Sequence, residues 1–128
     1  MASVRFTVKW KNLDRFRATM RRAPKDLRDI LDLQIREVME QRQRLSKRLA
    51  PVRTGRLRAG IRVRKRVRYV YELGVSGREV PYAFYQHEGT RYIRPRRFIS
   101  RALIGVRKEI QRVIRKWGDV IKRKHGWR

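Results

Sequence analysis

Apolar and polar side chains alternate along two parts of the chain, which predicts β-strands there. Residues 3–10 place every second side chain on an apolar side and the others on a polar side. The apolar positions are Val4, Phe6, Val8 and Trp10, and the polar ones are Arg5, Thr7 and Lys9. The same period covers residues 57–63 and 67–75, after a Thr54-Gly55 turn signal. We expect these two strands to form a hairpin that turns near Arg64–Arg66.

Helical spacing of apolar residues predicts one short helix and two long ones. The short helix follows Asn12 and stops before Pro24. A longer helix starts at Pro24 and ends at Pro51, since proline suits a first turn and cannot continue a helix. The last helix reaches residue 122, with a narrow apolar stripe and an otherwise basic surface. That stripe consists of Ile99, Leu103, Val106, Ile110, Val113, Ile114, Trp117 and Ile121.

The segment "YAFYQHE" predicts a helical turn that starts at Pro81 and closes at Gly89, with Tyr82, Phe84 and Tyr85 directed inward. Residues 91–98 follow as an extended connector, because Pro95 disfavours helix in the residue before it. The expected fold is therefore α+β. A small antiparallel sheet, made of the N-terminal strand and a basic hairpin, packs against a long central helix and a long C-terminal amphipathic helix.

Composition favours a single domain. The chain has 128 residues, of which 41% are hydrophobic, enough for a modest core without metals or disulfides. We expect one domain over residues 1–128, with residues 122–128 as a flexible basic tail. Cysteine is absent, which fits assembly in a reducing cytoplasm. The N-terminus lacks the apolar core of a signal peptide and no apolar run reaches membrane-spanning length, so we expect a soluble protein with no membrane partner.

The formal net charge of +26 is the largest departure from ordinary composition. Such a chain repels itself and attracts nucleic acid, anionic membranes or acidic proteins. The shortage of acids is local, because no acidic residue lies between Glu40 and Glu72. Like charges on paired strands are destabilising, so we expect something outside the hairpin to compensate its arginines.

The central helix carries an acidic band opposite its apolar stripe, made of Asp26, Asp29, Glu37 and Glu40. Two interpretations stay open. The band is a solvated face with pairs such as Asp32 with Arg36 and Glu40 with Arg44, or it docks on a neighbouring basic subunit.

The sequence offers little for catalysis. The histidines are His87 and His125, and His87 lacks the second histidine four residues on that a zinc-binding helix requires. No Gly-rich phosphate loop or nucleophile elbow is present. Neighbouring residues on a helix point about 100° apart, so His87 and Glu88 are poorly placed as an acid-base pair, and Glu88 fits better as a partner for nearby arginines. We expect a non-enzymatic protein without a metal or cofactor.

Two sequence blocks, "APVRTGRLRAGI" and "VPYAFYQHEGTRYIRPRRFISRAL", resemble the tail-completion, or head-to-tail joining, proteins of long-tailed double-stranded DNA bacteriophages. The resemblance covers residues 27 to 105. The first block matches at Ala50, Pro51, Val52, Thr54, Gly55, Leu57 and Ile61. The second matches at Tyr82, Ala83, Tyr85, Gly89, Thr90, Pro95, Phe98, Ala102 and Leu103. Glu88 takes the acidic position of the family motif and directly precedes Gly89. In the family, an aromatic residue usually stands between the acidic residue and the glycine.

The resemblance implies a structural virion protein that forms a ring, a hexamer of identical subunits, at the head-tail junction. Its partners would be the neck, or head-completion, proteins and the tail-tube proteins, and genomic DNA would pass through the ring. In such a ring the hairpin arginines would line the lumen and contact phosphates without sequence preference. The residues expected to face DNA are Arg58, Arg62, Arg64, Lys65, Arg66 and Arg68. The alternative is a free-standing, sequence-independent nucleic-acid-binding protein, although the sequence shows no helix-turn-helix, zinc-finger or RNA-binding sheet signature.

Overall fold

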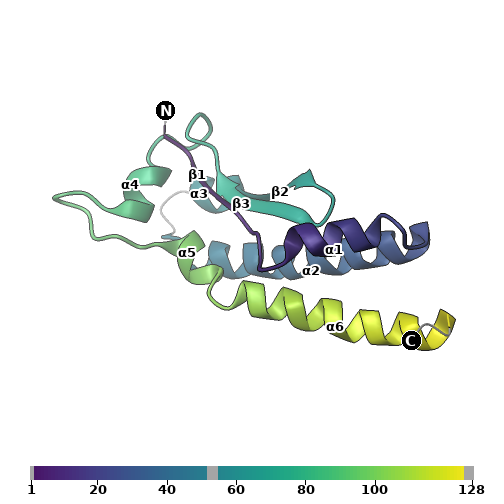
Figure 1. Cartoon of the computed structure of the whole chain (residues 1–128). Helices are drawn as coiled ribbons and strands as arrows, with labels where there is room; N and C mark the ends of the chain where they lie inside the picture. The colour runs from purple at the N-terminus through teal and green to yellow at the C-terminus, as the bar shows by residue number, and fades with distance from the viewer. Residues whose placement is uncertain (1, 52–54, 126–128) are drawn as a thin grey trace.

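The computed structural model of the chain describes residues 2–51 and 55–125, and its architecture is α+β (Figure 1). This confirms the predicted fold class. The elements in chain order are β1 (Val4–Thr7), α1 (Leu13–Met20), α2 (Lys25–Leu49), α3 (Arg56–Gly60), β2 (Ile61–Val67), β3 (Val70–Val75), α4 (Ala83–Glu88), α5 (Phe98–Ala102) and α6 (Val106–His125).

The three strands form an antiparallel sheet in the order β1-β3-β2, so β3 is the central strand. Val75 lies opposite both Val4 and Ile61, and Leu73 lies opposite both Phe6 and Val63. These apolar side chains share one face because side chains alternate along a strand. They belong to the core that the sheet forms with α2, which packs against β2 and β3.

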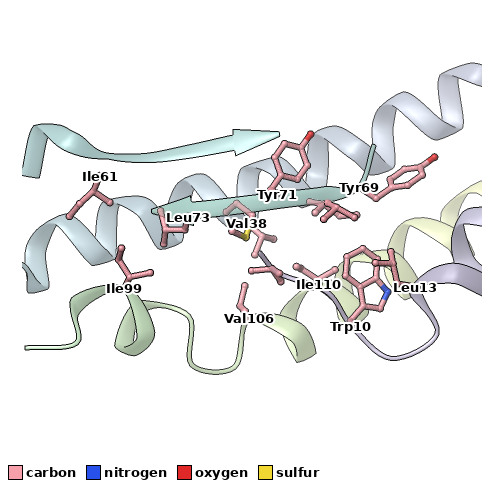
Figure 2. Packing of buried hydrophobic residues seen from close by; sticks show 14 of the residues in the cluster. Trp10, Leu13, Val38, Ile61, Tyr69, Tyr71, Leu73, Ile99, Val106 and Ile110 are labelled. Atoms are coloured by element: carbon pink, nitrogen blue, oxygen red, sulfur yellow. The ribbon is translucent and has the colours of Figure 1, made fainter. Parts of the chain in front are cut away.

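Helix α2 is the centre of the fold and α6 runs alongside it (Figure 1). Its buried side chains recur at helical spacing and include Leu31, Ile35 and Met39. Phe98 and Ile99 of α5, with Val106 and Ile110 of α6, complete the same core. Figure 2 shows Ile99, Val106 and Ile110 there. Burial of apolar area on this scale is the main stabilising term for the domain.

The hairpin differs from the prediction at the start of its first strand and at its turn. Residues 56–60 form the short helix α3, so the expected strand over 57–63 begins only at Ile61. The left-handed Gly55 (φ 77°) precedes α3, and Leu57 and Gly60 are buried at helical spacing. The turn lies at Arg68-Tyr69, with Val67 opposite Val70, and not at Arg64–Arg66. The Tyr69 ring, which packs on Phe16, fixes this later turn.

The C-terminal helix, predicted to be continuous, is divided into α5 and α6. Gly105 has φ 77°, a conformation that favours glycine and breaks the helix between Ala102 and Val106. Helix α6 then continues to His125, beyond residue 122 where we expected a tail to begin, and residues 126–128 lie outside the described residues. The short helix α4 and its end at Gly89 agree with the prediction, but Tyr85 is exposed, not directed inward.

Candidate nucleic-acid and assembly interfaces

The sheet face turned away from α2 is basic. Arg5 of β1 and Arg62 of β2 both lie opposite Gly74, and Arg64 lies opposite Glu72. We call Arg5, Arg62, Arg64 and Arg66 the arginine face. Gly74 gives the Arg5 side chain room, since an added Cβ would lie 2.4 Å from the Val4 carbonyl oxygen and 3.0 Å from Arg5 Cγ.

One carboxylate lies beneath these arginines. Glu72 is only 4% exposed, and its oxygens are 3.9 Å from Arg5 Nε and 3.8 Å from Arg66 Nη1. These distances are long for hydrogen bonds, so the contacts are mainly electrostatic. Arg62 pairs with Glu79 at 3.5 Å. Compensation of the hairpin therefore comes partly from within it, through Glu72, and partly from outside it, as expected, through Glu79 and the acids of α2. Arg64 has no carboxylate partner among the described residues.

The structure divides the six residues that we expected to face DNA. Arg62, Arg64 and Arg66 belong to the arginine face. Arg5 belongs to it as well, although it was not among the six residues expected to face DNA. The alternation of residues 3–10 had placed Arg5 on the polar side of its strand. Lys65 and Arg68 instead pair with acids of α2, at 2.8 Å from Asp32 and 3.5 Å from Asp29. Arg58 lies on α3, and its Nε is buried without a hydrogen-bond partner in the described part of the chain.

Asp32 connects α2 to the hairpin. Its Oδ1 accepts the Tyr69 amide at 2.8 Å, and its Oδ2 accepts Lys65 Nζ at 2.8 Å. Burial acts to raise the pKa of Asp32, but the hydrogen bonds from Lys65, Tyr69 and Tyr71 outweigh it and lower the pKa below 3.8. Burial and the nearby Asp32 carboxylate raise the pKa of Tyr71, so its hydroxyl stays protonated. Asp32 thus holds the hairpin in place.

The acidic band of α2 is only partly used within the chain. Asp29 pairs with Arg68, and Glu40 accepts Arg36 Nε at 3.1 Å. The expected pairs of Asp32 with Arg36 and Glu40 with Arg44 are therefore wrong, because the hairpin takes Asp32 and Arg36 reaches Glu40 first. Asp26 and Glu37 pair with no cation in the described ranges.

The two blocks that carry the family resemblance meet in one groove of about 960 Å³. We call it the motif groove. Its lining residues come from both blocks and from the connector: Pro51, Gly55, Arg56, Leu57, Tyr82, Gln86, Tyr92, Ile93, Arg94 and Arg96. The matched residues Ala50, Leu57, Ile61, Ala83, Phe98 and Ala102 are buried in the core, while Val52 and Thr54 lie outside the described residues.

The connector after α4 is a well-defined loop. Gly89 has φ 81°, and an added Cβ there would lie 2.8 Å from Pro95 Cδ, so the loop folds tightly on itself. Thr90 Oγ1 accepts the amides of Tyr92 and Ile93 at 3.1 and 3.0 Å. We call residues 89–97 the basic loop, since it carries four arginines and no acid. Thr90 and Pro95 of the matched motif therefore shape this loop.

His87, which is buried, and Glu88, which is exposed, are in direct contact. His87 is fully buried, its Nδ1 lies 2.9 Å from Glu88 Oε1, and its Nε2 lies 3.3 Å from the Ser100 amide. The Ser100 amide donates to Nε2, so the imidazole satisfies one of the free amides at the start of α5. Glu88 therefore pairs with His87 and not with an arginine. Ser100 Oγ is 3.4 Å from Nε2, and the ring packs between Phe6 and Phe98.

Comparisons with protein-family models, curated proteins and solved structures found no match for this chain. Among the described residues, no group of acids and histidines is arranged to hold a metal ion. No described helix is long and apolar enough to cross a membrane.

Proposed function

We propose that this protein is a structural subunit of a ring at the head-tail junction of a tailed bacteriophage, joining the neck to the tail tube and surrounding the DNA passage. The observation that carries the proposal is the motif groove. Two blocks whose order resembles the tail-completion family, separated by a hairpin, come together on one surface of the fold. Residues that share a surface although they are distant in sequence are expected where that surface has a common task.

The charge distribution supports the DNA part of the proposal. The arginine face is exposed, and its four arginines are accompanied by two carboxylates, Glu72 and Glu79. A basic sheet face without base-reading elements suits contacts to phosphates, which carry no sequence information and allow DNA to move past. Repetition of this face around a ring would line its lumen with positive charge.

Electron microscopy of the purified, concentrated protein tests the proposal, with annuli that have a central hole as the expected result. Cryo-electron microscopy of the particle that carries the protein adds a second test, in which density for the fold is expected between portal and tail tube. A protein that stays monomeric at every concentration while retaining DNA would support the free-standing nucleic-acid-binding alternative instead.

A further inference from the structure

One exposed stripe of α2 joins acidic and apolar side chains that no described part of the chain covers. Asp26, Ile30, Leu33 and Glu37 are spaced by four, three and four residues, so they lie on one side of the helix. Leu33 is 51% exposed and Ile30 is 37% exposed. We call these four residues the α2 stripe. An acidic, partly apolar surface on a molecule of charge +26 is complementary to that molecule's own basic surfaces.

The basic loop has the opposite character. It projects away from the body of the fold between α4 and α5 (Figure 1). Tyr92 is 88% exposed, the most exposed of the large hydrophobic side chains described. The guanidinium groups of Arg91, Arg94 and Arg96 have no carboxylate partner among the described residues, and Arg91 lies over the Tyr92 ring at 5.8 Å. Tyrosine and arginine together are typical of the residues that anchor protein interfaces.

The loop is held in shape before any partner binds. The Thr90 hydroxyl accepts two loop amides, and the Thr90 amide donates to the Ile93 carbonyl oxygen at 2.9 Å. At the base of the loop, the amides of Arg96 and Arg97 each donate at 3.0 Å to carbonyl oxygens of α4. A segment that is already ordered loses little conformational entropy on docking.

We infer that the basic loop of one copy docks on the α2 stripe of the next copy, with Tyr92 against Ile30 and Leu33 and the loop arginines against Asp26 and Glu37. The inference rests on the proposed function and names the contact between neighbours in the ring. The two surfaces differ, so the contact is head-to-tail, and such contacts close into rings when the rotation between copies allows it. The arginine face fits the stripe less well, because it already holds Glu72 and Glu79 and lacks an exposed aromatic side chain.

The absence of cysteine allows a direct test. Leu33→Cys and Tyr92→Cys are prepared as single variants, mixed, and oxidised with diamide. A disulfide-linked heterodimer is expected from the mixture, and a ladder of larger species from the double variant. Ile104→Cys is the matched control, since Ile104 is an apolar side chain that is 73% exposed outside the stripe. It should give no product with the Tyr92→Cys variant.

A charge exchange gives a second readout. Glu37→Arg and Arg94→Glu should each weaken self-association by roughly tenfold, and their combination should restore it. If the Tyr92→Cys variant cross-links to itself, or to the Ile104→Cys control, as much as to the Leu33→Cys variant, the proposed contact is overturned. Annuli that form without a link between the two introduced thiols would overturn it and leave the ring intact. If neither annuli nor the link is found, the contact and the proposed function both fail.

Discussion

Asp32 shows how one carboxylate stabilises an unfavourable turn. Tyr69 has φ 72°, a conformation that L side chains rarely adopt and that costs about 1 kcal/mol or more. The Asp32 carboxylate offsets this cost by accepting the Tyr69 amide, and the Tyr69 ring is buried against Phe16. The same carboxylate binds Lys65 of β2. The hairpin is therefore attached to α2 at two points by a single side chain.

Asp32→Asn should lower the free energy of unfolding at pH 7 by about 1 kcal/mol, because the charge that holds Lys65 is lost while an acceptor for the Tyr69 amide remains. The pKa of Asp32 is lower in the folded state than its ordinary value of 3.8. Its stabilisation is thus fully present above that value and disappears as the pH falls through the folded pKa. Urea unfolding at pH 7 and at lower pH measures both effects.

The control for this change is Glu37→Gln, which removes an exposed acid without a cation partner from the middle of the same helix and should leave stability almost unchanged. If both variants lose equal stability, or if the Asp32→Asn loss persists at a pH well below 3.8, the link to the hairpin does not stabilise the fold.

Gly74 is a second residue whose identity is fixed by packing. Gly74→Ala should lower the free energy of unfolding by about 2 kcal/mol, because the new Cβ would lie 2.4 Å from the Val4 carbonyl oxygen and force β1 and β3 apart. Chemical denaturation measures the change. Gly118→Ala is the matched control, since nothing lies within 4 Å of a Cβ in the middle of α6, and it should stabilise the protein by about 0.5–1 kcal/mol. Similar effects from the two variants would show that glycine is not required at position 74.

Among the helices, Arg42 of α2 holds together the break between α5 and α6. Its Nη1 donates to the carbonyl oxygens of Ala102 at 3.1 Å and Ile104 at 2.6 Å, and its Nη2 pairs with Glu109. The carbonyl groups at the end of a helix need such donors, since they have no partner within it. Arg42 therefore sets the direction in which α6 leaves α5.

Arg42→Met should lower the free energy of unfolding by about 2–3 kcal/mol, because it keeps the length of the side chain but leaves the two carbonyl oxygens and Glu109 without their donor. Amide hydrogen exchange of α6 should become faster, as the helix loses its attachment to α2. Arg44→Met, at an exposed position two residues further along the same helix, should change neither measurement. Unchanged exchange in the Arg42→Met variant would show that apolar packing alone positions α6.

The elements that the sequence predicted well are those with long and regular apolar spacing, such as α2 and the strands β1 and β3. The points where elements are interrupted, such as the break between α5 and α6, were harder to predict, because they depend on contacts between residues that are distant in sequence. Nothing near Gly105 indicates that Arg42, more than sixty positions earlier, supplies donors for an interrupted helix. Alternation around Leu57 fits a strand as well as the short helix α3, and the buried neighbours of Leu57 and Gly60 decide between them.

The residues of the candidate surfaces were also only partly predictable, because local patterns do not show which distant segments lie side by side. Alternation placed Arg62 and Arg64 on one face of the hairpin and Arg5 on the polar side of the first strand, but only the register of β1 with β3 shows that Arg5 adjoins them. Alternation also assigned Arg68 to that face, and Lys65 was placed with Arg66 at the predicted turn. The pairing of Lys65 and Arg68 with acids of α2 depends on how α2 lies against the hairpin, which periodicity does not give.

For the whole molecule, charge is divided among surfaces with different partners. Acids of α2 neutralise one edge of the hairpin, the α2 stripe stays acidic, and the arginine face stays basic. A net charge of +26 spread evenly would oppose assembly of identical subunits. This division instead separates an acidic surface from a basic one, as the proposed ring around DNA would require.

The arginine face is expected to bind duplex DNA without sequence preference. The triple variant Arg62→Gln, Arg64→Gln and Arg66→Gln should reduce the slope of log affinity against log salt concentration by about three, since each phosphate contact contributes about 0.9. Glutamine is chosen because three new carboxylates above the buried Glu72 would destabilise the sheet. Fluorescence anisotropy with two unrelated duplexes, between about 50 and 200 mM salt, gives the slopes and the sequence dependence.

The matched control removes the same charge from another surface. Arg107→Gln, Arg112→Gln and Arg115→Gln together take three exposed arginines from α6 and leave the arginine face intact. This control should keep the wild-type slope, because a local contact depends on where the charges are, whereas general attraction depends only on their number. Equal losses in both triple variants would mean that DNA is attracted by net charge alone, and the sheet would then have no particular place at the lumen.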